Sequence, residues 1–425
     1  MDSYQQTLNY LYETLPMFQR IGAAAYKDNL DNTIALCKTL GNPERKFKSI
    51  HIAGTNGKGS SSHMLAAILQ TAGYKTGLYT SPHLKEFTER IKINGEDASH
   101  SFIIDFVHRM KPVLEEIKPS FFETTVAMAF EYFAQQKVDV AVIEVGLGGR
   151  LDSTNVITPE VSLITNISWD HANLLGDTLQ KIAAEKAGII KPNIPVVISE
   201  RQPELESVFT EKAAKENSPI IFASDDYRLF TMGNGQFAFS HYEEEIAYQL
   251  QLKGDYQQMN LAGVLATVEA LKKKGFKISQ ESISEGLRNT ITLTQLKGRW
   301  QKLGDRPLVV CDTGHNEAGI KEVLKQINKE KFKDLHIVWG MVNDKDPGRV
   351  LALLPKNAHY YFCQAKIPRA MNAGELREKA KAFGLLGEVI EDINQAIDHA
   401  RKNCSPDDMI FIGGSTFVVA EIDNL

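Results

Sequence analysis

The chain has 425 residues, 43% hydrophobic and 24% charged, which is the balance of an ordinary soluble globular protein with two or three domains. With 48 Lys and Arg against 53 Asp and Glu, the formal net charge is −5, which argues against a protein held to nucleic acid or anionic lipid by bulk charge. The four cysteines form no C-x-x-C pair, so neither a zinc knuckle nor a disulfide scaffold is indicated. The N-terminal residues do not resemble a signal peptide and no apolar run approaches the roughly 20 residues that span a bilayer, so we expect a cytoplasmic protein.

Short β-branched runs alternate with helical patterns along the first half of the chain. This alternation predicts an α/β domain with a mainly parallel sheet. The near-continuous apolar run 138–145 is typical of a central strand buried on both faces. The predicted strands are 48–53, 75–80, 138–145, 161–167 and 194–199, and the predicted helices are 60–72, about 100–118, 121–136 and about 256–274.

The stretch 222–252 is different, because it is polar and carries Gly233-Asn234-Gly235 between alternating segments, which predicts antiparallel hairpins. A second α/β pattern begins near residue 307, and we place the domain boundary within 297–300. The expected domains are therefore residues 1–298 and 299–425. The predicted elements of the second domain are strands 307–311, 335–340 and 409–413 and a helix at 316–329.

The strongest chemical signal is segment 51–60, HIAGTNGKGS, which lies between a predicted strand and a predicted helix. Glycines let backbone N–H groups turn toward phosphate oxygens, and Lys58 could reach the outer phosphates. The strict pattern G-x-x-x-x-G-K-[ST] is not met, because Ile52 replaces a required Gly and Gly59 separates Lys58 from Ser60. A turn that binds nothing and a P-loop GTPase or kinase are the alternatives. No N-K-x-D guanine-binding element stands in the expected place.

Several polar residues follow predicted strands of the same sheet. Glu144 ends the run 138–145, where a carboxylate near a phosphate loop is well placed to hold magnesium. Ser81 could complete a magnesium shell, although taken alone it is a turn cap. His171 lies beyond strand 161–167, and Lys186 by itself would be a solvated helix charge.

Together these motifs resemble one family, the folylpolyglutamate synthases, which include bacterial enzymes that are also dihydrofolate synthases and belong to the wider Mur ligase family. The motifs are GTNGKGS, TSPHL, FFE, EVGLGGRLDSTN, TNISWDH and EKAGIIKP, in this order. The resemblance implies a P-loop-type, mainly parallel sheet domain followed by a smaller Rossmann-like α/β domain, equivalent to the Mur ligase central and C-terminal domains.

The resemblance also implies a reaction in folate biosynthesis and one-carbon metabolism. ATP and magnesium would activate a folate or dihydropteroate carboxylate as an acyl phosphate, which the amine of L-glutamate attacks. The partners would be these small molecules, with no nucleic acid and no membrane, and the protein would be a monomer. A Mur-type ligase acting on a different acid and a non-catalytic nucleotide-binding protein are the alternatives.

Site residues follow from the matched positions. The implied catalytic residues are Lys58, His171 and Lys186, the last of which is carbamylated in this family, and the implied magnesium ligands are Ser81, Glu144 and His171. The implied ATP-binding residues are Gly54, Thr55, Asn56, Gly57, Lys58, Gly59, Ser60, Asn260, Arg299 and Asp312. Phe122, Thr125 and Asp152 would lie near the pteroyl group, and His315 and Ser415 near glutamate.

This chain departs from the family pattern at three places. The common D-G-A-H-N-P is DTGHNE at 312–317, which puts the shape of that loop in doubt. Tyr256 replaces the His of H-Q-x-x-N, and Val126 replaces the second Thr after FFE. None of these positions belongs to the predicted metal or phosphate set.

Overall fold

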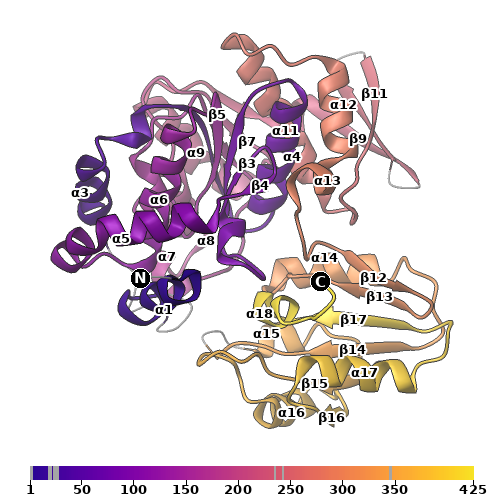
Figure 1. Cartoon of the computed structure of the whole chain (residues 1–425). Coiled ribbons are helices and arrows are strands. Elements are labelled where there is room, and N and C mark those ends of the chain that lie inside the picture. Colours follow the sequence, from indigo (N-terminus) through magenta and orange to yellow (C-terminus); the bar gives the residue numbers. More distant parts are fainter. Residues whose placement is uncertain (1–2, 18–21, 23–27, 234–235, 242–243, 344–346) are drawn as a thin grey trace. The chain divides into compact units, whose positions relative to one another are not determined.

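The computed structural model describes residues 3–17, 22, 28–233, 236–241, 244–343 and 347–425 (Figure 1). The chain divides into two compact units, the first comprising Met1–Gln251 and Gln257–Leu296 and the second Leu252–Tyr256 and Lys297–Leu425. This division differs from the expected domains of 1–298 and 299–425 mainly because the short segment Leu252–Tyr256 belongs to the second unit.

The first unit is built on an eight-stranded sheet with the order β4-β3-β2-β5-β1-β6-β7-β8. Only β3 pairs antiparallel, with β2 and β4, so the predicted mainly parallel sheet is confirmed. The strands are β1 Lys48–Ala53, β2 Thr76–Tyr79, β3 Ile91–Ile93, β4 Glu96–Asp97, β5 Val140–Glu144, β6 Val161–Ile164, β7 Val196–Ile198 and β8 Ile220–Phe222.

Helices cover both faces of this sheet. On one face α4 (Lys58–Thr71) and α11 (Gln257–Lys273) run side by side (Figure 1). On the other face Ile143 of β5 packs into the cluster that contains α5 and α6, and Ile164 of β6 into the cluster that contains α8 and α9. Burial on both faces explains why β5 carries apolar residues at each position from Val140 to Ile143 rather than alternating. The remaining helices of the first unit are α1 Tyr4–Thr14, α3 Asp31–Thr39, α5 His100–Ile117, α6 Phe121–Gln135, α7 Ala172–Leu175, α8 Leu179–Ala187, α9 Glu206–Lys215, α10 Ala223–Asp226, α12 Gln280–Arg288 and α13 Thr290–Thr294.

The polar stretch after β8 forms the expected antiparallel strands. They are β9 (Tyr227–Gly233), β10 (Gln236–His241) and β11 (Glu244–Gln249), in a separate sheet of order β11-β10-β9. Asn234 and Gly235 of the predicted turn lie outside the described residues.

The second unit has a six-stranded sheet of order β12-β13-β17-β14-β15-β16, parallel except between β12 and β13. Trp339 and Phe411 belong to the core on one face, whereas Val338 and Ile410 belong to the core on the other. No helix among the described residues combines the length and apolar character that a bilayer crossing requires. The elements are β12 Gln301–Asp305, β13 Leu308–Cys311, α14 Glu317–Ile327, β14 Leu335–Trp339, α15 Gly348–Leu351, β15 His359–Phe362, α16 Ala373–Lys381, β16 Gly387–Val389, α17 Ile393–Asn403, β17 Met409–Gly413 and α18 Thr416–Ala420.

Candidate active site

The carboxyl ends of four neighbouring strands meet at one edge of the first unit's sheet. β2, β5, β1 and β6 are consecutive and parallel, so the segments that follow them all leave at this edge. In open α/β sheets ligands bind at this edge, outside the carboxyl ends of the strands. The sequence-predicted residues that follow these strands are Ser81, Glu144, His171 and the loop 54–60.

The predicted phosphate loop turns the chain from β1 into α4. Gly54 and Gly57 have φ angles of 146° and 86°, which L side chains rarely adopt. A Cβ atom at Gly54 would lie 1.8 Å from the Oγ1 of Thr165, so the close approach of this residue, which directly follows β6, also requires glycine. The backbone N–H of Thr55 donates to the carbonyl of Asn166 at 2.8 Å. The loop is therefore tied to the neighbouring strand end.

Helix α4 begins at Lys58, directly after this loop. Its N-cap is Gly57, which offers no side chain to cap the first turn. Gly59 and Ser60 are buried in that first turn, and the Ser60 hydroxyl accepts from the Nε2 of Gln257 at 3.1 Å. The N–H groups and the positive end of this 14-residue helix make an anion-binding site where the loop meets it.

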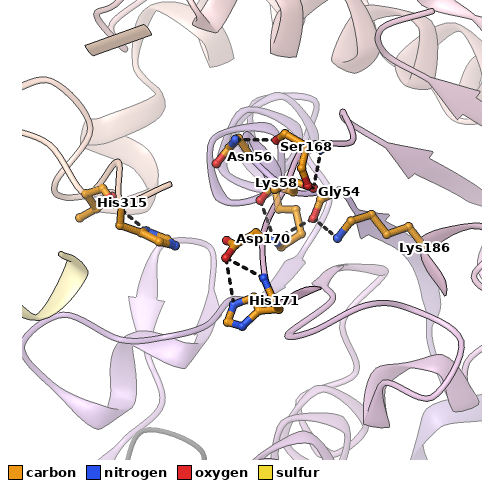
Figure 2. Close-up of polar contacts among 10 residues, drawn as sticks. Gly54, Asn56, Lys58, Ser168, Asp170, His171, Lys186 and His315 are labelled. Carbon is orange, nitrogen blue, oxygen red and sulfur yellow. Dashed lines mark hydrogen bonds and ion pairs between the residues drawn. The ribbon is translucent and has the colours of Figure 1, made fainter. Parts of the chain in front are cut away.

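Helix α11 brings Asn260 against the same loop. A Cβ atom at Gly57 would lie 2.0 Å from the Asn260 Oδ1, so the amide fills the space beside that glycine. The Asn260 Nδ2 donates to Gln257 at 2.9 Å, which fixes its orientation. The Asn56 Nδ2 donates at 3.2 Å to the hydroxyl of Ser168, which follows the carboxyl end of the neighbouring β6 (Figure 2).

Two lysine ammonium groups converge on one carbonyl of the loop (Figure 2). The Lys58 Nζ donates to the carbonyls of Gly54 at 3.0 Å and Thr55 at 3.2 Å. The Lys186 Nζ donates to the same Gly54 carbonyl at 2.8 Å. Because the Lys58 ammonium lies beside a glycine loop, the site is favourable for a polyanion such as a nucleotide phosphate.

Lys186 is not the solvated helix charge that its sequence alone would suggest, because it is only 4% exposed at the end of α8. Burial, and then the charge of Lys58, lower its pKa from 10.5 to about 7. Asp170 and Asp152 oppose this shift. The Lys186 amine is therefore neutral in a large fraction of molecules near neutral pH.

The predicted metal ligands Ser81 and Glu144 lie together. Glu144 is 5% exposed at the end of β5, and its Oε2 accepts the backbone N–H of Ser81 at 3.1 Å. A buried carboxylate beside a hydroxyl residue is a set of hard oxygen donors of the kind that magnesium prefers.

His171, the third predicted ligand, adopts a left-handed conformation with φ 50° just before α7. Its backbone N–H donates to the Oδ1 of Asp170 at 2.9 Å, and the same oxygen lies 3.7 Å from its Nε2 (Figure 2). Sequence analysis did not single out Asp170, although it lies inside the motif TNISWDH. Its carboxylate lies against His171 and raises the pKa of Lys186, opposing the effect of burial.

The three predicted pteroyl-binding residues have different environments. Phe122 is half-buried, and its ring fills the space beside Gly146, where a Cβ atom would lie 2.4 Å from it. Thr125 is fully buried and its hydroxyl bonds to Tyr79 and to the Phe122 carbonyl, both at 3.0 Å.

The carboxylate of Asp152 organises the loop after β5. It accepts the backbone N–H groups of Leu147 at 2.8 Å and Thr154 at 3.0 Å. Burial raises its pKa above 3.8, and those hydrogen bonds oppose the rise. Thr125 and Asp152 therefore shape this region through internal hydrogen bonds, a role that a motif match does not show.

A buried guanidinium also lies in this region and was not predicted. Arg90 is 3% exposed, its Nε donates to the Nδ1 of His83 at 2.8 Å, and it lies 5.2 Å from the centre of the Phe121 ring. Burial lowers the Arg90 pKa, and Glu144 is among the charges that oppose this shift. Its only sequence signal is its place shortly after TSPHL, because nothing local marks an arginine that will be buried.

In the second unit, Asp312 follows β13 and is buried. Its Oδ2 accepts the backbone N–H of Trp300 and the hydroxyl of Tyr256, both at 2.7 Å, and its Oδ1 accepts the N–H of Gly314 at 2.7 Å. Tyr256, which replaces the family's His, therefore belongs to this unit and orients the Asp312 carboxylate.

The other three predicted residues of this unit lie near the carboxyl ends of β13 and β17, which are parallel neighbours. Arg299 donates to the hydroxyl of Thr313, the residue that replaces the family's Gly. The Nδ1 of His315 lies 2.9 Å from the carbonyl of Thr313. The Ser415 hydroxyl caps α18 by accepting the N–H of Phe417 at 3.2 Å. Thr313 thus anchors two of the predicted side chains in the altered loop.

Comparison with known proteins covers both units. The family model described as Mur ligase middle domain matches residues 52–268, and the one described as Mur ligase, glutamate ligase domain, matches residues 298–416. A dihydrofolate synthase/folylpolyglutamate synthase of Bacillus subtilis is 33% identical over 438 aligned positions, which cover 99% of this chain and 98% of that protein.

Solved structures agree with these matches. The structure of E. coli FolC in complex with DHPP and ADP has a TM-score of 0.88 and 28% identity, and the match covers 99% of this chain and 96% of that one. A bifunctional folylpolyglutamate synthase/dihydrofolate synthase of Yersinia pestis, complexed with AMPPNP and Mn ion, has a TM-score of 0.84 and 28% identity over 99% and 97% of the two chains. The chain therefore belongs to the Mur ligase family, within the branch of the dihydrofolate and folylpolyglutamate synthases.

Proposed function

We propose that this chain is an ATP-dependent ligase that joins L-glutamate to the carboxylate of dihydropteroate or of a reduced folate, releasing ADP and phosphate. Its relatives carry the names of both syntheses. The observation that carries the proposal is the glycine loop after β1, on which Lys58 and Lys186 converge beside the Ser81–Glu144 pair. Sites of this composition bind and polarise nucleotide phosphates.

The chemistry requires two anions to meet. A carboxylate oxygen bonds to the γ-phosphorus of ATP while the bond to the bridging oxygen of ADP breaks, giving an acyl phosphate. The glutamate amine then bonds to the acyl carbon, phosphate leaves, and the amine proton is lost. No side-chain nucleophile is needed, so the protein contributes mainly positive charge and positioning. Lys58 supplies such a charge at the loop.

Magnesium fits the donors at the sheet edge. The buried Glu144 carboxylate with Ser81 would hold one ion, and His171 beside Asp170 would contribute to a second. When bound, magnesium would neutralise phosphate charge during transfer. The relative from Yersinia pestis was solved with Mn ion and AMPPNP, which supports the use of a divalent cation by this chain.

Lys186 would carry a carbamate in the working enzyme. Its pKa of about 7 leaves a neutral amine, whose lone pair can bond to the carbon of carbon dioxide with loss of a proton. The product is an anion with two oxygen acceptors in place of a cation. An anion would relieve the repulsion from Lys58 that contributes to the lowered pKa.

The remaining contacts would come from Asn260 of the first unit and from residues of the second unit. We assign Asn260, Arg299 and Asp312 to ATP, and His315 and Ser415 to glutamate. Phe122 would contact the pteroyl group, with Thr125 and Asp152 shaping its surroundings. The family description of residues 298–416 as a glutamate ligase domain supports the assignment of glutamate to this unit.

The proposal is tested by ADP release from the full chain. With magnesium and ATP, we expect ADP only when L-glutamate and a pteroyl acid are both present, and mass spectrometry should show a product one glutamyl residue heavier. Dihydropteroate and tetrahydrofolate are assayed side by side, which shows whether one or both syntheses occur. ADP release with another amino acid or another acid, and none with these, would establish a Mur-type ligase of different specificity.

Two further properties are part of the proposal, a cytoplasmic location and a monomeric state. The small negative net charge of −5 and the absence of a membrane-spanning helix among the described residues are compatible with the first. Light scattering coupled to gel filtration would test the second against the 47.4 kDa expected for one chain.

A further inference from the structure

A mixed group of metal-binding side chains lies in the second unit and includes none of the residues assigned above. His336 is in β14, Cys404 directly follows α17, and Asp408 directly precedes β17. Each side chain offers one ligand atom, which is a ring nitrogen of His336, the Sγ of Cys404 or a carboxylate oxygen of Asp408. These three atoms lie within 4.8 Å of one another. The His336 Nε2 is 3.7 Å from the Asp408 Oδ2. Among the described residues this is the one such group of three found.

We propose that His336, Cys404 and Asp408 bind a zinc ion, with water as the fourth ligand. Imidazole, thiolate and carboxylate are all zinc ligands, and the thiolate selects against magnesium and calcium. Zinc–ligand bonds of about 2.0–2.3 Å place neighbouring ligand atoms roughly 3.3–3.8 Å apart in a tetrahedron, so side-chain adjustments of an ångström or less would close the site.

Two features of the surroundings suit a metal. The Nδ1 of His336 is 3.0 Å from the Tyr361 hydroxyl, a partner that leaves Nε2 facing Asp408 and fixes the ring. His336 and Asp408 are buried, whereas Cys404 is partly exposed and gives access from solvent. Binding would release the thiol proton to solvent, because zinc takes the thiolate as its ligand.

The group is separate from the residues of this unit that the ligase proposal uses. It lies at the amino ends of β14 and β17, which pair in register with His336 opposite Ile410. Asp312 and Ser415 follow the carboxyl ends of β13 and β17. A five-residue strand spans about 17 Å, so the zinc would lie about that far from Ser415. It would tie the end of α17 to the two central strands.

The test is a cobalt titration of the reduced, metal-free full chain, with magnesium and ADP present in excess. We expect one equivalent of Co²⁺ to produce a thiolate charge-transfer band and tetrahedral visible bands, which Zn²⁺ then abolishes by displacement. Cobalt in the proposed nucleotide site gives no such band, because Ser81, Glu144 and His171 include no thiol. This readout is therefore independent of the proposed ligase activity.

Variants locate the ligands. Cys404→Ser should remove the charge-transfer band and weaken zinc binding by about 100-fold or more, while leaving ligase turnover in magnesium unchanged. Tyr361→Phe should keep the band and weaken binding by about 10-fold. Cys37→Ala, in the first unit, is the matched control and should behave as the unaltered chain.

The proposal fails if the unaltered chain gives no charge-transfer band. It also fails if the band persists in Cys404→Ser. In either case Asp408 only stabilises its own turn, where its Oδ2 accepts the Ser405 N–H at 2.6 Å. Thermal unfolding gives a second readout, because zinc should raise the midpoint of the unaltered chain and not that of Cys404→Ser.

Discussion

The burial of Lys186 makes its replacement the most informative perturbation of the proposed site. In the proposed carbamate, the nitrogen of Lys186 is bonded to a carboxylate group. The side chain is then an anion with two hydrogen-bond acceptors rather than a cation. Lys186→Ala removes this group, and Lys186→Arg keeps a permanent positive charge that does not react with carbon dioxide. We therefore expect both variants to lose nearly all ligase activity.

The structure supplies the magnitude. A shift from 10.5 to about 7 corresponds to a cost of roughly 5 kcal/mol for charging the buried amine, at 1.36 kcal/mol per pKa unit. At about pH 8 roughly 90% of the amine would be neutral, against roughly 0.3% for an unperturbed lysine. The concentration of the form that reacts with carbon dioxide is thus raised about 300-fold, and burial is the larger cause.

The sign of the pH dependence follows from the same shift. Because the folded pKa is lowered, the unfolded chain binds more protons between about pH 7 and 10.5, so this group makes stability rise with pH in that window. In carbon dioxide-free buffer, Lys186→Met should be more stable than the unaltered chain below about pH 7, and the difference should shrink toward pH 10. Urea unfolding of both proteins at several pH values measures this difference in the free energy of unfolding.

Activity assays complete the test. Short carboxylates such as acetate should partly restore Lys186→Ala by supplying the missing anion, and should not restore Lys186→Arg. Carbon-13 NMR with labelled bicarbonate should show a carbamate resonance in the unaltered chain that both variants lack. Normal turnover by Lys186→Arg would refute the carbamate and leave Lys186 as a cation beside Gly54.

Two further predictions concern the phosphate loop. Lys58→Ala should lower kcat/KM by about 100-fold or more, because the Lys58 ammonium would stabilise phosphate charge that grows in the transition state. Urea unfolding of this variant should be unchanged. Turnover within tenfold of normal would reject this role. Gly54→Ala should lower ATP affinity measured by calorimetry and destabilise the fold by about 1–3 kcal/mol, because its Cβ would meet the Thr165 hydroxyl at 1.8 Å. Gly73→Ala is the control, since Gly73 also has a positive φ, 89°, but no atom within 4 Å of the added Cβ, and it should leave ATP affinity unchanged.

The sequence by itself determined the order of the main elements and the place of the phosphate loop. Local periodicity and glycine placement depend only on residues that are neighbours in the sequence. They therefore identify strand 48–53, the helix that follows it and the buried strand that ends at Glu144. Short strands such as β3 and β16 were not predicted, because three residues carry too little periodicity. The family motifs then identified residues that local patterns leave ambiguous, such as Ser81.

Only the tertiary structure decided the chemical state of the site residues. Lys186 reaches the Gly54 carbonyl across 132 positions of sequence, and its burial and lowered pKa arise from that packing. Likewise, Asp152 uses its carboxylate on its own loop, and Tyr256 belongs to the second unit, where its hydroxyl donates to Asp312. A side chain's environment is set by which distant segments the fold brings together, and desolvation and charge–charge interactions depend on that environment rather than on neighbours in the sequence.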